Sequence, residues 1–356
     1  MIIVDGHLDL ALNALQNNRD LMLDAHTTRV LECSTPGKGK SQGTVAFPDM
    51  RRGRIALCFT TVCARCTGRA APHIDFGSPT QAYGIAQGQL AYYRGLEREG
   101  VVRVITNAAM LESHIEEWKA WELKASEAQP PLGLVVTMES ADPVLDPGQL
   151  EHWWSQGLRI IGPAHFGVGR YSGGTGSNVG LREAGPALLQ EMERLGFLLD
   201  TTHLSDEAFW DCLNHFHGRV LASHTNSRTL VPHQREFLDE QLKAVIERDG
   251  VIGVTLGNWQ LLQGWIVGAK NDKFQVTLDR AVDHMDYICQ LAGNSDHVAI
   301  GSDLDGGVGS DEFPSDLDTI ADLQRFEHLL DKRGYSTEAI NKILHANWID
   351  LLRKSW

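Results

Sequence analysis

Seven side chains that are able to bind a metal ion or move a proton stand at or just after short apolar segments of this sequence. His7 and Asp9 come first, two positions apart, at the end of the segment MIIVDG. Residues i and i+2 of a strand point to the same side, so these two side chains are able to aim at one point. The other five follow five further apolar segments, and they are Glu139, His165, His203, His224 and Asp303.

The chemistry of these groups fits two metal ions better than one. Imidazole and carboxylate ligands without a thiolate favour Zn²⁺, although Mn²⁺ and Co²⁺ fit too. Three imidazoles and two or three carboxylates exceed the three protein ligands that are usual for a single catalytic zinc. Glutamate has two oxygens and is able to bridge two ions. Two ions sharing a water would lower its pKa from about 15.7 towards about 7 and polarise a carbonyl group.

Each of these residues has a simpler interpretation when it is taken alone. A single histidine at a strand end more often satisfies local hydrogen bonds than binds a metal, and Asp303 would serve as a helix cap. It is the placement of all seven residues at predicted strand ends that indicates a metal site. The pair Cys63 and Cys66 has the C-x-x-C spacing of a zinc knuckle or a redox pair, but no second pair accompanies it, so we interpret both as structural cysteines.

The elements that would position these residues alternate along the chain. Short apolar segments predict eight strands at Ile2–Asp5, Arg54–Thr61, Gly133–Met138, Leu158–Ala164, Phe197–Thr202, Arg219–Ser223, Val251–Leu256 and Val298–Ser302, with an extra short segment at Val101–Ile105. Amphipathic segments predict helices at Gln81–Glu99, Ser113–Glu127, Leu181–Leu195, Asp206–Phe216, Asp239–Arg248 and Leu278–Ala292. Ser205 and Thr277 stand in N-cap positions.

This alternation predicts an α/β fold, a single (β/α)₈ TIM barrel of the metal-dependent hydrolase type that spans residues 1–356. A doubly wound sheet is the alternative, but no glycine fingerprint follows the first strand. Barrel enzymes carry their chemistry at the C-terminal ends of the strands, where the predicted ligands fall. The glycine-rich segment 167–180 lacks the Lys-Ser/Thr ending of a phosphate loop, and we interpret it as a mobile barrel loop or lid.

The composition limits the partners that this protein is expected to have. The 356 residues carry a net charge of −14, which argues against nucleic acid and against an anionic membrane surface. No apolar run approaches the roughly 18 residues of a membrane helix. The six cysteines are few and irregularly spaced, and no targeting signal is apparent, so we expect reduced thiols and a cytoplasmic location. A homodimer is compatible with the sequence.

Six stretches of the chain resemble the membrane (renal) dipeptidase family of zinc metallopeptidases, within the amidohydrolase-like barrels. They span residues 5 to 306 in the family's order and read DGHLDL, MESADP, PAHFG, LGFLLDTTHLSDEAF, LASHTNSRTLVPHQREFLDEQLKAV and IGSDLDG. The resemblance implies that His7 and Asp9 bind one zinc ion and that His203 and His224 bind the other. It also implies that Glu139 bridges the two ions.

The resemblance implies roles for three further residues. Asp303 corresponds to the aspartate beside the bridging water, suited to proton shuttling. His165 corresponds to the histidine that contacts the scissile carbonyl and the tetrahedral intermediate. Arg235 corresponds to the arginine that binds the C-terminal carboxylate of the substrate, a role that suits the planar guanidinium. The chain departs from the family pattern at Ser140, where glycine is common, at Glu236, where asparagine is expected, and in residues 345–348, where a GGN-like turn is usual.

We therefore expect a binuclear zinc-dependent dipeptidase that hydrolyses the peptide bond of dipeptides, including dipeptides with a D-residue at the C-terminal position, by a metal-bridging hydroxide. One alternative is a metal-dependent amidohydrolase that acts on another amide, such as an N-acyl amino acid or a β-lactam. The other is a barrel that binds a ligand without turnover.

Overall fold

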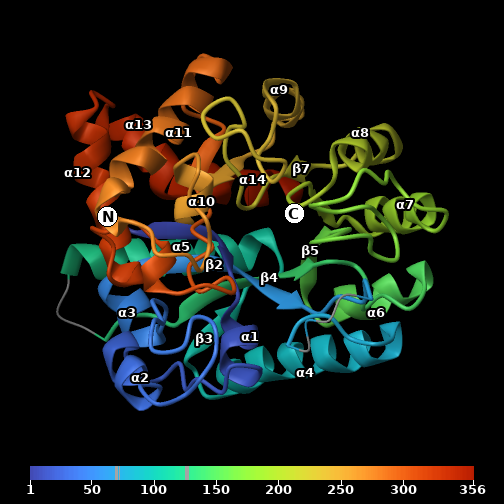
Figure 1. Ribbon diagram of the computed structural model, residues 1–356, viewed down its shortest axis with the longest axis horizontal. Coiled ribbons are helices and arrows are strands. Elements are labelled where there is room, and N and C mark those ends of the chain that lie inside the picture. The colour runs from blue at the N-terminus through green and yellow to red at the C-terminus, as the bar shows by residue number, and fades with distance from the viewer. Residues whose placement is uncertain (69–70, 72, 125–127) are drawn as a thin grey trace.

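A nearly closed barrel of parallel strands forms the centre of the molecule (Figure 1). The structure is a computed structural model that describes residues 1–68, 71, 73–124 and 128–356. Within these residues the strands are β1 (Ile3–Leu8), β2 (Ile55–Cys63), β3 (Val102–Val104), β4 (Leu132–Glu139), β5 (Leu158–Gly162), β6 (Leu198–Asp200), β7 (Val220–Leu221), β8 (Ile252–Val254) and β9 (Val298–Ile300). Their order in the sheet is β7-β6-β5-β4-β2-β1-β9-β8.

The two ends of this sheet meet and close the barrel. Ala222, just after β7, forms a parallel bridge with Ile252 of β8. The Ala222 amide donates to the Val251 carbonyl at 3.0 Å, and the Gly253 amide donates to the Ala222 carbonyl at 2.8 Å. The barrel thus contains the eight strands predicted from the sequence. The extra short segment forms β3, which pairs with the start of β4 while β5 pairs with its end.

The first and last strands of the barrel are joined by one carboxylate. Asp5 of β1 pairs with Ile300 of β9. Its side chain accepts a hydrogen bond from the Ser302 amide at 2.8 Å and another from the Ser302 hydroxyl. Because Asp5 and Ser302 are 297 positions apart, this contact ties the two halves of the chain together.

Helices surround the strands, as Figure 1 shows. They are α1 (Leu10–Leu15), α2 (Ala25–Leu31), α3 (Phe47–Arg52), α4 (Pro79–Arg98), α5 (Ala108–Lys124), α6 (Leu150–Ser155), α7 (Gly185–Leu195), α8 (Asp206–His215), α9 (Asp239–Glu247), α10 (Asn258–Leu261), α11 (Leu278–Ala292), α12 (Arg325–Lys332), α13 (Thr337–Asn341) and α14 (Asn347–Ser355). None of the helices that the structure describes is long and apolar enough to cross a bilayer.

The predicted helices are present, with shifts at their ends. The helix α11 has the predicted bounds, and α8 begins as predicted after the Ser205 cap, whose side chain accepts from the Ala208 amide at 3.0 Å. Thr277 occupies the N-cap of α11 without a side-chain hydrogen bond. The helix α5 begins five residues earlier than predicted, and residues 125–127 of that prediction lie outside the described residues. The helix α7 begins at Gly185 because Leu181 bridges to Ser172 instead.

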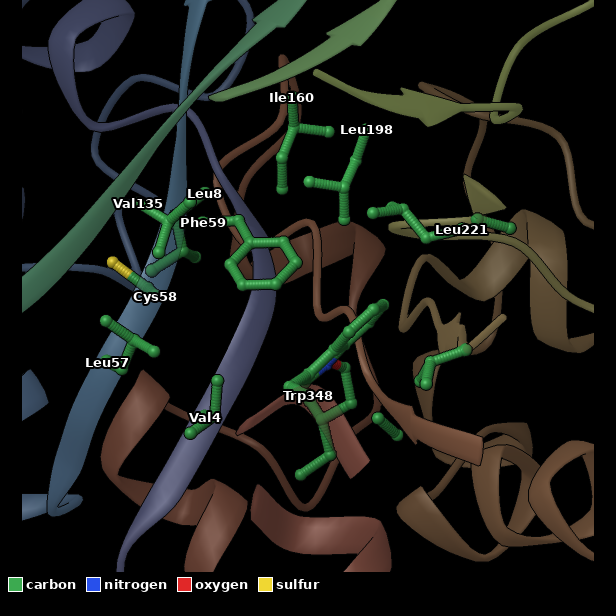
Figure 2. Close-up of a cluster of buried hydrophobic side chains, with 14 of the residues drawn as sticks. Val4, Leu8, Leu57, Cys58, Phe59, Val135, Ile160, Leu198, Leu221 and Trp348 are labelled. Carbon is green, nitrogen blue, oxygen red and sulfur yellow. The ribbon is translucent and has the colours of Figure 1, made fainter. Parts of the chain in front are cut away.

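An apolar cluster fills the inside of the barrel below the predicted site (Figure 2). Phe59 packs against Trp348, with ring centroids 4.8 Å apart, and the Trp348 indole donates to the Ile300 carbonyl at 2.8 Å. Phe59 and Cys63 share one face of β2, and Val135 and Glu139 share one face of β4, because side chains alternate along a strand. The apolar layer and the polar site are therefore successive layers of one inner face.

A buried histidine on α11 predicts how stability depends on pH. His284 accepts a hydrogen bond from the Ser227 amide at 3.2 Å, and burial lowers its pKa to about 4. As the pH falls below about 6.5 the unfolded chain takes up a proton at this residue, whereas the folded chain does so only near pH 4. Stability is therefore lost across this window.

The substitution His284→Asn keeps an acceptor and removes the proton uptake. Between pH 7 and pH 4 the free energy of unfolding of the wild type should fall by about 3 kcal/mol more than that of the variant. Urea denaturation at each pH measures the difference. Identical pH dependence in the two proteins would show that His284 is protonated in the folded state as readily as in the unfolded chain.

Candidate metal centre

Six strands deliver the predicted site residues to one end of the barrel, with a repeated spacing. His165, His203, His224 and Asp303 each lie three positions after the last residue of a strand, namely Gly162, Asp200, Leu221 and Ile300. Glu139 is the last residue of β4. His7 lies inside β1, which is longer than predicted, and Asp9 is the N-cap of α1.

The side chains converge on one carboxylate oxygen. Glu139 Oε1 lies 3.0 Å from His203 Nε2 and 3.4 Å from His224 Nε2. The same oxygen lies 3.9 Å from His7 Nε2 and 3.7 Å from His165 Nε2. The structure therefore brings together four imidazoles that are far apart in the sequence.

Three groups of candidate ligands among the described residues contain Glu139: one joins it to Cys63 and His165, and the other two consist only of residues predicted to bind metal. Of these two, one contains His7, Asp9 and Glu139, and the other contains Glu139, His203 and His224; within each group the ligand atoms lie within 4.8 Å of one another. Asp303 Oδ1 lies 3.9 Å from His7 Nε2, and Asp9 Oδ2 lies 3.8 Å from the same nitrogen. A shared carboxylate between two ligand sets is the arrangement expected for a pair of cations.

Hydrogen bonds at Nδ1 fix the protonation of two histidines. The Ser223 hydroxyl donates to Asp200 at 2.5 Å, so it accepts from His224 Nδ1 at 2.8 Å. The Thr175 hydroxyl donates to the His203 carbonyl at 3.2 Å and accepts from His203 Nδ1 at 3.1 Å. With the proton on Nδ1, each Nε2 presents a lone pair, which is how metal-binding histidines are held.

The histidine and carboxylate atoms that face the centre of the site would bind a metal ion, but they do not satisfy one another by hydrogen bonds. The Nε2 atoms of His203 and His224 lie 3.2 Å apart, and two lone pairs at that distance repel unless a cation lies between them. Among the described residues, the buried atoms His7 Nε2 and Asp9 Oδ1 have no hydrogen-bond partner. Nitrogen and oxygen donors of this kind suit Zn²⁺ and related divalent ions.

Burial and mutual repulsion shift the pKa values of the acidic groups upward. Burial is the main cause that raises the pKa of Glu139 to about 7 and that of Asp303 to about 8. Burial opposes the charge of His7, but Glu139 and Asp9 outweigh it and raise the His7 pKa to about 10. These shifts express the cost of burying several carboxylates together, a cost that a cation at this point would remove.

Three residues at the site have left-handed backbone conformations. The φ angles are +68° at His203, +56° at Asp303 and +76° at Ser140. Such values are uncommon outside glycine and concentrate at functional sites. Ser140 directly follows Glu139, so the glycine that is common at this position in the family would adopt the same turn without strain.

Two glycines allow the chain after β7 to enter the barrel. A Cβ atom on Gly253 or Gly301 would lie 2.0 Å or 1.9 Å from the Ser223 carbonyl oxygen. Any side chain at either position would push this carbonyl away and move His224, which is the next residue. The glycines therefore contribute to the site without touching it.

The segment 167–180 is held firmly against the site, in contrast to the mobile loop expected from its glycines. Thr175 donates its amide to the His165 carbonyl at 2.9 Å, and Gly174 donates to Gly167 at 2.7 Å. Tyr171 is fully buried and donates its hydroxyl to the Val144 carbonyl at 2.7 Å. The segment carries Thr175 to His203, a contact that no local pattern in the sequence predicted.

A cavity of about 710 Å³ opens over these groups and contains the last predicted site residue. Arg235 is buried and donates from Nη2 to the His224 carbonyl at 2.7 Å. Its Nη1 has no partner within the part of the chain that the structure describes. The apolar side of the cavity includes Phe166, Trp259 and Phe313. The cavity thus offers an apolar wall and an unpaired guanidinium N–H.

Two residues at the site had been given no functional role from the sequence. The Cys63 thiol donates to Glu139 Oε2 at 3.3 Å, although we had interpreted this residue as structural. Arg65 donates to His165 Nδ1 at 2.8 Å. The six cysteines all fall in described residues and are free thiols. No sequence pattern predicted the Cys63–Glu139 or the Arg65–His165 contact, because the two residues of each pair belong to different strands or to the segments that follow them.

A parallel α/β barrel with imidazoles and carboxylates at the C-terminal ends of its strands defines a metal-dependent hydrolase of the amidohydrolase-like type. The chain belongs to the membrane dipeptidase family, peptidase family M19, which matches residues 1–355. It is therefore a peptide hydrolase of the metallodipeptidase class.

Two curated relatives match part of the chain. An uncharacterised protein from the pqqA 5′ region of Klebsiella pneumoniae is 32% identical over 234 residues, which cover 63% of this chain and 83% of the relative. Dipeptidase tcpJ of Claviceps purpurea (strain 20.1) is 29% identical over 205 residues, which cover 56% of this chain and 45% of tcpJ.

Solved structures agree with the barrel over the whole chain. A metallopeptidase of family M19, dipeptidase AC, has a TM-score of 0.77 at 25% identity and covers 100% of this chain and 99% of its own. A metallopeptidase of Rhodobacter sphaeroides, bound to a phosphinate mimic of L-Ala-D-Ala, has a TM-score of 0.76 at 24% identity with the same coverage.

The Nδ1 contacts predict how metal affinity responds to a remote substitution. Thr175→Val keeps the shape of the side chain and removes the acceptor for His203 Nδ1. Zinc affinity should fall about 10- to 100-fold, as is usual when the partner of a metal-binding histidine is lost. Competition with a coloured chelator measures it. The matched control is Thr201→Val, since the buried Thr201 hydroxyl bonds the Leu221 carbonyl and no site histidine. Equal affinity in the two variants would contradict this assignment.

Proposed function

We propose that this protein is a two-zinc dipeptidase that hydrolyses the peptide bond of dipeptides, including those with a D-residue at the C-terminal position. The observation that carries the proposal is the convergence of two ligand sets on Glu139. His7 and Asp9 would hold one ion, His203 and His224 the other, and Glu139 both. When bound, the ions would supply Lewis acidity towards the carbonyl group and a lowered pKa for water.

Asp303 is the residue that we propose as the proton shuttle. Its side chain lies beside His7 and lines the cavity, so it faces both the ligand sets and the space for a substrate. A carboxylate in that position would take a proton from the attacking water and give it to the leaving amine.

His165 and Arg235 would bind the substrate. His165 Nε2 points towards Glu139 from the cavity wall and would donate to the carbonyl oxygen as that oxygen gains negative charge. Arg235 Nη1 is an unpaired charged donor on a residue that lines the cavity, and a carboxylate is its natural partner. Both assignments agree with the roles that the family resemblance implies.

The size and lining of the cavity favour a small substrate with a free carboxylate. The cavity volume of about 710 Å³ is in the range of small-molecule sites. The phosphinate mimic of L-Ala-D-Ala bound by the Rhodobacter sphaeroides protein supports a D-residue at the C-terminal position. We also propose that residues 1–356 act as one catalytic domain in the cytoplasm, which is supported by one continuous buried core and by the free thiols.

The loss of one ligand tests the function and the metal site together. His203→Ala should lose bound zinc and at least about 100-fold of dipeptide hydrolysis, because one ligand set loses half of its imidazoles. Metal analysis is combined with a panel of L-L, L-D and N-acylated dipeptides on the zinc-loaded proteins. His215→Ala, on exposed α8 surface, is the control. A fully active His203→Ala protein would refute the site, and a wild type that cleaves only N-acyl amino acids would replace the dipeptidase by another amidohydrolase.

The substitution Arg235→Met tests the carboxylate contact. KM for dipeptides should rise about 10- to 100-fold, because a charge-assisted pair is lost. The matching C-terminal dipeptide amides lack the carboxylate, so the variant should treat them as the wild type does. Arg228→Met is the control, since Arg228 pairs with Asp206 at 2.7 Å and does not line the cavity. An unchanged KM for free dipeptides would exclude Arg235 from substrate binding.

A further inference from the structure

One histidine of the site has a hydrogen-bond donor at its Nδ1, where two other site histidines have a hydroxyl acceptor. His203 and His224 each donate from Nδ1 to a hydroxyl group. His165 Nδ1 instead faces Arg65 Nη1 at 2.8 Å. A guanidinium has only donors, so Nδ1 of His165 must accept, and the ring proton must sit on Nε2.

We propose that Arg65 is a positioning residue that fixes His165 as a hydrogen-bond donor towards the substrate and prevents it from acting as a fourth metal-binding imidazole. The N–H of Nε2 then points to the region above Glu139, where the lone pairs of His203 and His224 also point. An imidazole with its Nε2 protonated cannot ligate through that atom. The inference rests on the proposed function only for the role of His165 towards the substrate.

Arg65 is itself held in place by a network that reaches beyond the site. Its Nε donates to Asp75 Oδ2 at 3.0 Å, and the Thr67 amide donates to Asp75 Oδ1 at 2.9 Å. The backbone of Arg65 accepts from the Phe76 amide and donates to the Ile74 carbonyl, both at 2.8 Å. The Arg65 side chain is only 9% exposed. The backbone of Arg65 and its Nε are thus both anchored, and its Nη1 is placed against His165 Nδ1.

The placement of Arg65 also explains why a cation is tolerated so close to the predicted metal ions. Its charge is paired with Asp75, whose Oδ2 accepts from Arg65 Nε and from the Thr67 hydroxyl. Arg65 lines the cavity, and the site residue to which its guanidinium donates is His165. A neutral acceptor in place of the guanidinium would favour a proton on Nδ1 of His165. Nε2 would then present a lone pair to the site.

Two substitutions of Arg65 by side chains of similar size separate the loss of its hydrogen bond to His165 from a loss of packing. Arg65→Lys keeps a donor with sufficient reach, and Arg65→Met keeps a flexible chain without a donor. Zinc-loaded Arg65→Met should lose about 10- to 100-fold in kcat, with KM changed less than about threefold, because the lost interaction strengthens in the transition state. Arg65→Lys should retain most of the activity. The control is Arg170→Met on the neighbouring segment, where Arg170 donates to the Leu145 carbonyl.

Nitrogen NMR of ¹⁵N-histidine-labelled protein, with and without zinc, reads the ring proton directly. The His165 signal is identified by its loss in His165→Gln. Wild type and Arg65→Lys should show a single form protonated at Nε2, and Arg65→Met should show a second form protonated at Nδ1. A merely structural role of Arg65 would not move this signature.

A double substitution completes the test. On a His165→Gln background, Arg65→Met should cost little further activity. The proposal is overturned if His165 in Arg65→Met stays protonated at Nε2 alone, or if Arg65→Met costs the same with and without His165. A wild type that cleaves no dipeptide would defeat the proposed function, and the NMR comparison would still decide the role of Arg65.

Discussion

A single oxygen atom governs the arrangement of this site. Glu139 Oε1 lies 3.0 to 3.9 Å from Nε2 of four histidines that come from four strands. Hydrogen bonds to neutral partners cannot satisfy so many inward-facing groups, because at least two of the imidazoles present lone pairs. The barrel holds these groups together through the hydrogen bonds between its strands, the left-handed turns after them and the apolar layer beneath them. A positive charge at the centre would turn the electrostatic cost of this cluster into binding energy.

The histidines at the site differ in the hydrogen-bond partner of their outer nitrogen, Nδ1. A hydroxyl that accepts from Nδ1 of His203 or His224 leaves Nε2 with a lone pair for a metal ion. The guanidinium that donates to Nδ1 of His165 leaves the ring proton on Nε2, which is then a hydrogen-bond donor. One residue type therefore supplies two kinds of chemistry within a few ångströms, and the outer partner selects between them. Those partners come from loops, so substitution in the loops changes the chemistry without a change in the ligands. This makes the outer contacts as informative about function as the inner ones.

The sequence predicted the barrel and the convergence of its strand ends, because apolar segments and the residues that follow them are local signals. The sequence pattern predicted that β1 ends before His7, whereas β1 includes this residue. The irregular register of β1 against β2 has no signature in the amino-acid composition. The left-handed turn at Ser140 was visible only as a departure from a family pattern. Arg65 and Thr175 could not be predicted, because each contacts a histidine 100 or 28 positions away across the top of the barrel. The segment 167–180, predicted as a mobile loop or lid, is bonded partly to distant residues: Tyr171 donates to Val144 and Thr175 contacts His203, 27 and 28 positions away.

The bond between Asp5 and Ser302 has a consequence for how the molecule is made. Ser302 follows Asp5 by 297 positions, so this seam of the barrel closes only after β9 and the residues behind it have been synthesised. Until then His7 and Asp9 have no fixed relation to Asp303. A chain that stops before β9 therefore lacks both this seam and the carboxylate that lies beside His7.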